Sequence, residues 1–427
     1  MTRKVFSWVI MGVMLLGGIL CSSGQAVPKS NPVVLQEIMD LLEKTGSEPV
    51  VLKGNDPNKL VVVTPKLMGR VMCCSFDGMP GKTNAFINEK QIRDGFSTKG
   101  YAARADDGWN SFGGEERIWF APEGGKWALF FEPGTEQNWD NYRMPFAMNS
   151  AQYQVVRKSE DDKAITFQSL LDIPNYQGFH FKVNVVRQVT VLESSPFSVG
   201  LGDRIENVGF ETETFATNVG DKQWKKESEP FAIWTLGIFN STPNTVVLFP
   251  YKEGPDSELG PPVTTEYFRY FCDNGKMDDN YWAVKPGCAL LKANSKVQTK
   301  LEMLRKRCLG RIASVDVETG EMTIVEFGLY PELPYTASFF LPFEGDPLDG
   351  GAMSSFVLKG EIGSAAKPAF YELEVCSPNL ELNPGETFRH VSRTYHLRGD
   401  KKAIEEVCKR FFNVDMKTLE AFDKQAN

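Results

Sequence analysis

The sequence predicts an antiparallel β-sandwich with short helices near its N- and C-terminal ends. Short segments of alternating apolar and polar residues follow one another through most of the 427-residue chain. Apolar residues at helical spacing occur only near the two ends, and turn-forming pairs such as Asp77-Gly78, Asn274-Gly275 and Pro384-Gly385 separate the alternating segments. Because alternation at period two buries one face of a strand, this pattern is typical of stacked antiparallel sheets.

Three helices are expected from apolar residues that recur every three or four positions. The first covers residues 32–44, where the apolar positions are Val34, Leu35, Ile38, Leu41 and Leu42. The second covers residues 403–412, with Ile404, Val407, Phe411 and Phe412 on one face. A third, shorter helix is expected over residues 416–422.

The clearest strand covers residues 179–191. One face carries Phe179, Phe181, Val183, Val185, Val189 and Val191, and the other carries His180, Lys182 and Asn184. The remaining expected strands are residues 50–52, 60–63, 70–75, 127–131, 246–249, 298–304, 320–326, 370–376 and 388–397. No repeat and no low-complexity linker divides them, so residues 27–427 are expected to form one domain.

The first 26 residues have the features of a secretory signal peptide. Arg3 and Lys4 precede an apolar run over residues 5–20, and Gly24-Gln25-Ala26 places small residues at a cleavage site. The run is short for a membrane span, although a retained N-terminal anchor is the alternative. Leu20 before Cys21 disfavours a lipoprotein. A periplasmic or secreted protein without stable membrane insertion after cleavage is therefore expected.

Charge and cysteine content narrow the function classes. The net charge of −8 and the absence of a basic cluster argue against nucleic-acid binding and against an anionic membrane surface. Seven cysteines follow the signal peptide, and Cys272–Cys288 is the first disulfide to consider, with buried free thiols as the alternative. There is no Cys-x-x-Cys pair, and the three histidines show no metal-ligand spacing, so neither a metal nor another cofactor is expected.

A glycine-bracketed segment over residues 113–125 carries the first candidate binding residues. Glu115, Glu116 and Arg117 offer directional hydrogen bonds, and Trp119 offers a flat apolar face. This mixture suits a sugar, which has many hydroxyl groups and apolar C–H faces. The four residues, together with Trp234, are predicted to bind a carbohydrate; the alternative for Trp119 is a place in the core.

The segment over residues 370–376 carries the candidate catalytic carboxylates. Strand alternation places Tyr371, Leu373 and Val375 on a core face, and Glu372 and Glu374 on a face toward a cleft or solvent. Downstream, His390 and His396 share a face of the strand over residues 388–397. If the two strands pair, His396 lies near Glu372 or Glu374, and a carboxylate beside an imidazole is a plausible acid–base pair.

Several motifs in order resemble the galactose mutarotase-like superfamily. They are Gly69-Arg70-Val71-Met72, residues 113–123, Arg204-Ile205-Glu206-Asn207-Val208-Gly209, Tyr371-Glu372-Leu373-Glu374 and Leu382-Asn383-Pro384-Gly385-Glu386. More closely, they resemble an uncharacterised family of exported Bacteroidota-type proteins. The resemblance covers about residues 50–397 and implies a β-supersandwich with a sugar cleft on the concave face of one sheet.

The resemblance also implies roles for individual residues. Glu374 matches the general base of aldose 1-epimerases, with Glu372 as the near alternative. The segment from Leu236 to Asn240 matches the stretch that carries the acid histidine of that superfamily, but Leu236 stands in the place of the histidine. His390 or His396 would then have to supply the acid.

Two functions follow as alternatives. The first is an enzyme acting on a carbohydrate, either epimerase-like or glycoside-processing, in which Glu115, Glu116 or Glu123 supplies the second carboxyl group that glycoside cleavage needs. The second is a non-catalytic carbohydrate-binding protein that has lost the acid histidine. A filled cleft would indicate a structural role instead.

Overall fold

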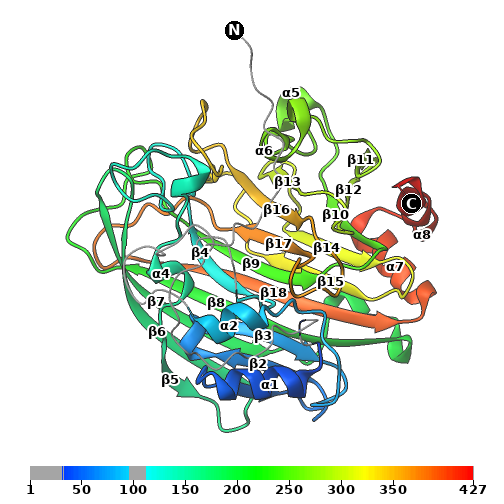
Figure 1. The fold of residues 1–427 in the computed structure, drawn as a ribbon. Helices are drawn as coiled ribbons and strands as arrows, with labels where there is room; N and C mark the ends of the chain where they lie inside the picture. Colours follow the sequence, from blue (N-terminus) through cyan, green and yellow to red (C-terminus); the bar gives the residue numbers. More distant parts are fainter. Residues whose placement is uncertain (1–30, 32, 96–111, 427) are drawn as a thin grey trace, which may run out of the picture.

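The computed structural model describes residue 31, residues 33–95 and residues 112–426, and the predicted signal peptide lies outside these residues. The described chain forms three antiparallel sheets, two of which face each other (Figure 1). The antiparallel β-sandwich predicted from the sequence is therefore confirmed. None of the helices in the described residues has the length and apolar character needed to cross a membrane.

The largest sheet has ten strands, and its long central strands form one side of the sandwich. In spatial order it consists of β11 (Trp282–Lys285), β12 (Cys288–Lys292), β10 (Thr245–Pro250), β14 (Arg311–Asp316), β15 (Met322–Phe327), β18 (Thr387–Gly399), β8 (Ile205–Asn218), β7 (His180–Val191), β6 (Ala164–Pro174) and β5 (Gln154–Lys158).

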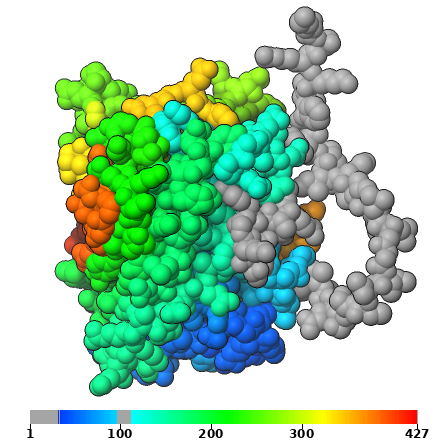
Figure 2. Space-filling model, turned by 90° about the vertical axis from the view of Figure 1, so that its left-hand side faces the viewer, coloured from blue at the N-terminus to red at the C-terminus, as the bar shows by residue number. Residues whose placement is uncertain are grey.

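Two smaller sheets complete the sandwich. The five-stranded sheet has the order β13 (Thr299–Leu304), β16 (Gly351–Leu358), β17 (Phe370–Cys376), β9 (Ala232–Asn240) and β4 (Arg117–Ala121). The three-stranded sheet, here called the N-terminal meander, consists of β1 (Val50–Lys53), β2 (Leu60–Thr64) and β3 (Arg70–Ser75). Figure 2 shows the meander, in blue, at the lower edge of the molecule against the green surface of the ten-stranded sheet.

Alternating apolar residues fill the space between the two large sheets. Val247 and Val325 of the ten-stranded sheet pack in one cluster with Tyr371, Leu373 and Val375 of β17. The core face predicted for residues 370–376 is thus confirmed. Burial of such side chains contributes about 1.5–3 kcal/mol each, so this layer supplies much of the cohesion of the fold.

The predicted terminal helices are confirmed as α1 (Leu35–Lys44), α7 (Lys401–Phe412) and α8 (Met416–Asp423). The Asp400 carboxylate accepts a hydrogen bond from the amide of Ala403 at the start of α7, and Asp415 does the same for Thr418 in α8. The apolar faces of both helices cover the outer face of the ten-stranded sheet.

Short helices that the sequence pattern did not predict lie between strands: α2 (Glu89–Asp94), α4 (Phe146–Asn149), α5 (Asp256–Leu259) and α6 (Phe268–Phe271). Single 3₁₀ turns are η1 (Pro65–Leu67), η2 (Trp139–Asn141), η3 (Pro196–Ser198), η4 (Gly202–Arg204), η5 (Asp273–Gly275) and η6 (Lys424–Ala426).

One expected strand and one conditional strand pairing are wrong, and of the two alternatives for Cys272 and Cys288 the free thiols are found. Residues 127–131 form a loop, because the amides of Leu129 and Phe130 bond to carbonyls of residues 122 and 123 instead of to a neighbouring strand. The strands over residues 370–376 and 388–397 do not pair, since β17 lies between β16 and β9 while β18 lies between β15 and β8. Cys272 and Cys288 form no disulfide, and both are free thiols.

One charge interrupts the apolar face of β7. Arg187 takes the place between Val185 and Val189 on the buried face, and its side chain is fully buried. Its Nη2 atom lies 2.6 Å from Oε1 of Glu116, which is also buried. This ion pair connects the ten-stranded sheet to the segment that enters β4.

Replacing Arg187 by alanine is expected to lower the free energy of unfolding by about 3–5 kcal/mol, because the Glu116 carboxylate would stay buried without its partner. Urea unfolding of both proteins measures the change. Arg389→Ala on β18 is the control, because Arg389 forms an exposed ion pair with Glu213 and its loss should cost less than about 1 kcal/mol. Equal losses for the two variants would contradict this prediction.

Candidate functional site

The segment over residues 115–119 does not form one binding surface, because its side chains point in different directions. Arg117 lies opposite Leu236 and Trp119 lies opposite Trp234 in the pairing of β4 with β9. Glu116 points to the other side, where it pairs with Arg187. Glu115 contacts His396. Of the predicted sugar-binding residues, only Arg117, Trp119 and Trp234 therefore lie together.

Arg117 belongs to a buried group of ionisable side chains, here called the charge cluster, and the two tryptophans lie beside it. Strand alternation brings Glu372 and Glu374 of β17 to the same face, as predicted, and does the same for two further residues of β13. The cluster consists of Arg117, Glu123, Lys300, Glu302, Glu372 and Glu374, with Trp119 and Trp234 beside them.

Glu374 is the most constrained member of the charge cluster. Its Oε2 atom lies 2.7 Å from Nζ of Lys300 and accepts hydrogen bonds from the indole N–H of Trp234 at 3.1 Å and the hydroxyl of Ser354 at 2.9 Å. Its Oε1 atom is buried and has no hydrogen-bond partner among the described residues. One oxygen is thus fully engaged, and the other is left to act on something else.

Arg117 and Glu372 form a second buried ion pair, with Nη2 and Oε1 2.9 Å apart. The guanidinium also lies 4.3 Å from the ring centre of Trp119, and Nζ of Lys300 lies 4.7 Å from that of Trp234. The two indoles pack edge to face at 5.6 Å and are almost fully buried. Trp119 is therefore a core residue as well as a neighbour of the charges.

Burial decides where protons are held in the charge cluster. Burial raises the pKa of Glu123 to about 8 and that of Glu302 to about 7, because a carboxylate is poorly solvated there. Burial likewise raises the pKa of Glu372, against the opposing effect of Arg117. With four carboxyl groups and two cations, the cluster reaches neutrality when two of the carboxyl groups are protonated. Glu123 is the best placed to hold one of these protons, because burial outweighs the hydrogen bond from the hydroxyl of Tyr142, which favours the carboxylate.

The space within the charge cluster is small. A cavity of about 30 Å³ is lined by the cluster members other than Glu302 and Glu374 and by the rings of Phe340, Phe356 and Phe370. This volume suits one or two water molecules. A sugar ring could enter only after the aromatic cover had moved.

The predicted acid histidines lie outside the charge cluster. Leu236, which stands where the resemblance implies a histidine, is buried directly opposite Glu374 in the strand register. His396 does not approach Glu372 or Glu374, because β17 and β18 belong to different sheets. His390 is buried on β18, where desolvation and then the Arg187 charge lower its pKa to about 4.

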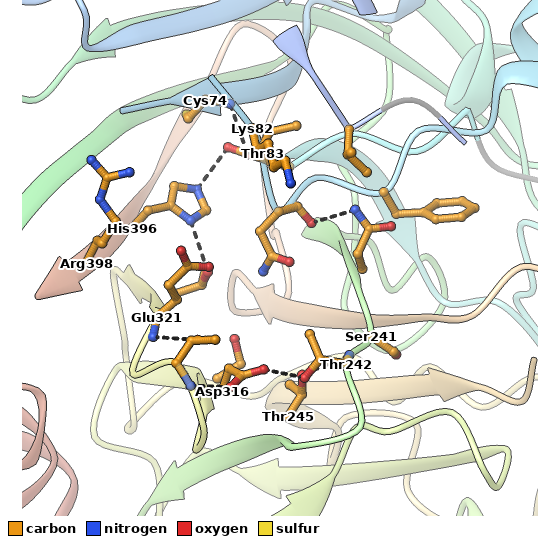
Figure 3. Close-up of a pocket in the computed structure, with 18 of the residues that line it drawn as sticks. Cys74, Lys82, Thr83, Ser241, Thr242, Thr245, Asp316, Glu321, His396 and Arg398 are labelled. Atoms are coloured by element: carbon orange, nitrogen blue, oxygen red, sulfur yellow. Dashed lines mark hydrogen bonds and ion pairs between the residues drawn. The ribbon is translucent and has the colours of Figure 1, made fainter. Parts of the chain in front are cut away.

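A second candidate site lies between the N-terminal meander and the ten-stranded sheet. This space, here called the interlayer cavity, has a volume of about 620 Å³ (Figure 3). Nε2 of His396 lies 3.0 Å from Oε2 of Glu115, and Nδ1 lies 3.0 Å from the hydroxyl of Thr323. The other oxygen of Glu115 accepts hydrogen bonds from the amide of Cys74 at 3.0 Å and the hydroxyl of Thr83 at 2.9 Å.

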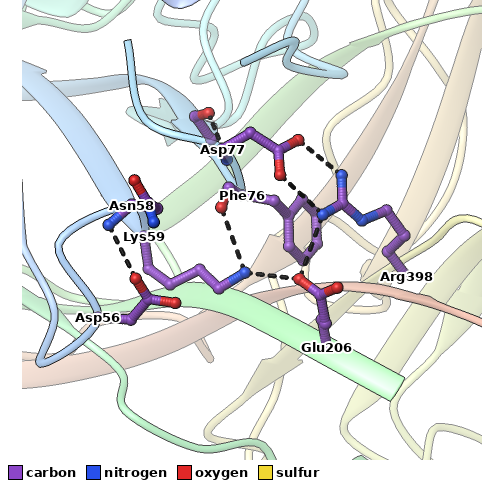
Figure 4. Close-up of polar contacts among 8 residues, drawn as sticks. Asp56, Asn58, Lys59, Phe76, Asp77, Glu206 and Arg398 are labelled. Atoms are coloured by element: carbon purple, nitrogen blue, oxygen red, sulfur yellow. Dashed lines mark hydrogen bonds and ion pairs between the residues drawn. The ribbon is translucent and has the colours of Figure 1, made fainter. Parts of the chain in front are cut away.

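Ion pairs hold the meander in place at the edge of the interlayer cavity (Figure 4). Arg398 of β18 binds both carboxylate oxygens of Asp77, at 2.7 and 2.9 Å, and also contacts Glu206 at 3.2 Å. Lys59 lies 2.7 Å from the same Glu206. These contacts join the turn before β2 and the loop after β3 to strands β8 and β18 of the ten-stranded sheet.

The sequence analysis missed Lys300 and Glu302. A signal was present, because alternation in the predicted strand over residues 298–304 places both on the face opposite Leu301 and Met303, which are core residues. Glu123 was recognised as a partner carboxyl group, and it does lie within reach of the Glu374 charge.

Several solved structures share the architecture at low identity. The Slr1438 protein of Synechocystis sp. PCC 6803 is 13% identical, with 82% of this chain and 96% of that chain covered and a TM-score of 0.45. A galactose mutarotase related enzyme from Lactobacillus acidophilus is 11% identical, with 83% and 99% covered and a TM-score of 0.44. A protein from Escherichia coli K12, described provisionally as an aldose 1-epimerase, is 12% identical, with 82% and 100% covered and a TM-score of 0.46. These are likenesses in outline, and no property of those proteins transfers to this chain.

Comparison with curated proteins gives no significant match. A family model described as a family of unknown function, DUF6786, matches residues 35–422. Because this match covers nearly the whole chain, the protein belongs to the DUF6786 family.

Proposed function

We propose that this protein is exported, binds a carbohydrate at the charge cluster, and acts on it by acid–base chemistry in which Glu374 takes a proton from the ligand and Glu123 gives one to it. The observation that carries the proposal is the burial of six ionisable side chains beside two tryptophans on one sheet face. Buried charges cost several kilocalories per mole unless every group is paired. Because buried charges of this kind are costly for the fold, a role in binding or catalysis explains their presence better than a contribution to stability does.

Glu374 and Glu123 have the complementary states that acid–base catalysis needs. Oε2 of Glu374 is held by an ammonium and two neutral donors, and its Oε1 atom is unengaged among the described residues. Glu123 keeps its proton at neutral pH, because burial raises its pKa to about 8. Two carboxyl groups in unlike environments can serve as base and acid in one site. In this proposal Glu123 takes the role for which the resemblance suggested a histidine.

A sugar is the ligand class that fits the other groups. Arg117 and Lys300 can donate to hydroxyl oxygens, and the aromatic rings around the cavity can cover apolar C–H faces. Three further polar atoms, Nε and Nη1 of Arg117 and Nε1 of Trp119, are buried without a hydrogen-bond partner among the described residues. They would gain partners from a polyhydroxylated ligand once the Phe340 side of the cavity opened.

The second candidate function is non-catalytic carbohydrate binding. It is favoured by Leu236, which places an apolar side chain directly opposite Glu374. In that case the carboxylates would only hold the sugar hydroxyls. Both functions predict that the protein binds a sugar, but only the first predicts turnover.

Glu374→Gln is expected to abolish turnover of a sugar or glycoside substrate found in a screen, while sugar binding survives, because glutamine keeps the shape but cannot accept the proton. Glu123→Gln should lower turnover by about 10²–10⁴-fold, the scale for one acid group. Steady-state kinetics and calorimetric binding on the same preparations measure both effects. The control is Glu258→Gln in the exposed helix α5, which should match the wild type. A wild type that binds sugars but turns none over would establish the second function instead.

The proton on Glu123 also predicts a pH dependence of stability. Between the ordinary carboxyl pKa of 4.5 and the value of about 8 in the folded protein, folded Glu123 binds a proton that the unfolded chain releases. The free energy of unfolding should therefore fall as pH rises through this window, by up to about 1.4 kcal/mol per pH unit from this group. Glu123→Gln removes this contribution, so its urea stability should fall less than that of the wild type between about pH 5.5 and pH 7.5. Parallel profiles would show that Glu123 is not protonated in the folded state.

Export predicts a mature protein that begins at Val27. The basic start, the apolar run and the small residues before Val27 motivate this expectation. N-terminal sequencing of the protein from its native cells, after separation of periplasm, membrane and medium, is the measurement. Recovery of an intact Met1 on membrane-bound protein would support a retained anchor.

A further inference from the structure

The wall of the interlayer cavity brings together three metal-ligating groups that lie far apart in the sequence. Cys74 comes from β3, Glu115 from the bend before β4, and His396 from β18. Figure 3 labels Cys74 and His396 in the lining of this cavity. A sulfur, a carboxylate oxygen and an imidazole nitrogen of these residues all lie within 4.8 Å of one another. All three side chains are buried at the cavity wall. We propose that Cys74, Glu115 and His396 form a binding site for a divalent transition-metal ion of the zinc class, with one coordination position open to the interlayer cavity.

The spacing of the ligand atoms fits a tetrahedral ion with little rearrangement. Zinc binds imidazole nitrogen and carboxylate oxygen at about 2.0–2.2 Å, so two such ligands of a tetrahedron are about 3.3 Å apart. Nε2 of His396 and Oε2 of Glu115 are already 3.0 Å apart. The sulfur ligand binds at about 2.3 Å, and the Cys74 sulfur lies within 4.8 Å of the other two ligand atoms.

Neighbouring groups orient two of the ligands as they do in established metal sites. The hydroxyl of Thr323 lies 3.0 Å from Nδ1 of His396, and it can accept a hydrogen bond from Nδ1–H so that the Nε2 lone pair is free for a metal. The Oε1 atom of Glu115 is held by Cys74 N and Thr83 Oγ1, which leaves Oε2 as the ligating oxygen. Each ligand is thus fixed from a different element, and the three meet at one point.

The donor set indicates which ions should bind. One sulfur, one nitrogen and one oxygen favour Zn²⁺ or Co²⁺ over Mg²⁺ and Ca²⁺, which prefer oxygen ligands alone. A thiolate and a carboxylate together balance the charge of a divalent ion. Three protein ligands beside a cavity of about 620 Å³ leave room for a water or a ligand group in the fourth position.

This site is separate from the proposed carbohydrate chemistry, because none of its ligands belongs to the charge cluster. It can therefore be tested without any sugar. The experiment uses the signal-cleaved protein, freed of metal with a chelator and titrated with Co²⁺. The wild type should bind one equivalent of Co²⁺ and develop tetrahedral visible bands with a thiolate-to-cobalt charge-transfer band in the near ultraviolet, and Zn²⁺ should displace the cobalt.

Matched variants separate the site from adventitious binding. Cys74→Ser should abolish the charge-transfer band, and His396→Asn should weaken Co²⁺ binding at least tenfold. Cys73→Ser and His390→Asn are the controls: Cys73 is the buried neighbour that packs on the α1 side, and His390 is a buried histidine of the same strand. Both should keep the spectrum of the wild type.

X-ray absorption of the zinc-loaded wild type needs no variant and therefore holds even if Cys74→Ser fails to fold. It should show one sulfur and two or three nitrogen or oxygen neighbours. A wild type that binds no Co²⁺ in a thiolate environment, a spectrum that survives Cys74→Ser, or zinc with only oxygen and nitrogen neighbours would each overturn the proposal.

Discussion

The ion pair between Glu116 and Arg187 is the contact on which the arrangement of both candidate sites depends. It fixes which face of β4 points to the ten-stranded sheet, since Glu116 reaches Arg187 on one side and Arg117 reaches Glu372 on the other. A shift of one residue would exchange these faces. Glu116 would then meet Glu372, and Arg117 would meet Arg187, so two buried attractions would become two buried repulsions. The register of β4 is therefore specified by charge as well as by apolar packing.

The glycines before β4 also help to set which way its side chains point. Gly113 and Gly114 have φ values of +87° and +101°, which other residues rarely adopt. A side chain on Gly113 would meet the carbonyl oxygen of Phe86 at 2.0 Å. The glycines therefore allow the backbone to pass close to another segment of the same chain. By turning the backbone there, they direct Glu115 into the interlayer cavity and the following residues into β4.

The side chains with candidate functions lie in two separate places, the charge cluster and the interlayer cavity. The cluster holds four carboxyl groups and two cations, with two indoles beside them, and the cavity next to it measures only about 30 Å³. The interlayer cavity holds the imidazole, the thiol and a carboxylate beside about 620 Å³. In the charge cluster, burial decides which carboxyl groups hold protons. In the interlayer cavity, the positions of Cys74, Glu115 and His396 suit the proposed metal ion. The histidine expected beside Glu374 is instead the histidine beside Glu115, because β18 belongs to the ten-stranded sheet.

The sequence by itself determined the antiparallel strands, the terminal helices and the shared face of Glu372 and Glu374, because each follows from local periodicity. It also indicated that residues 113–123 carry unusual chemistry. Only the tertiary structure decided which strands are neighbours, and therefore that Lys300 and not His396 meets Glu374. Lys300 and Glu374 are 74 residues apart and lie on strands separated by β16, so their contact depends on the assembly of the whole sheet, which no local pattern records. For the same reason, the meeting of Cys74, Glu115 and His396 could not be foreseen from their spacing, since three different elements place them at one point.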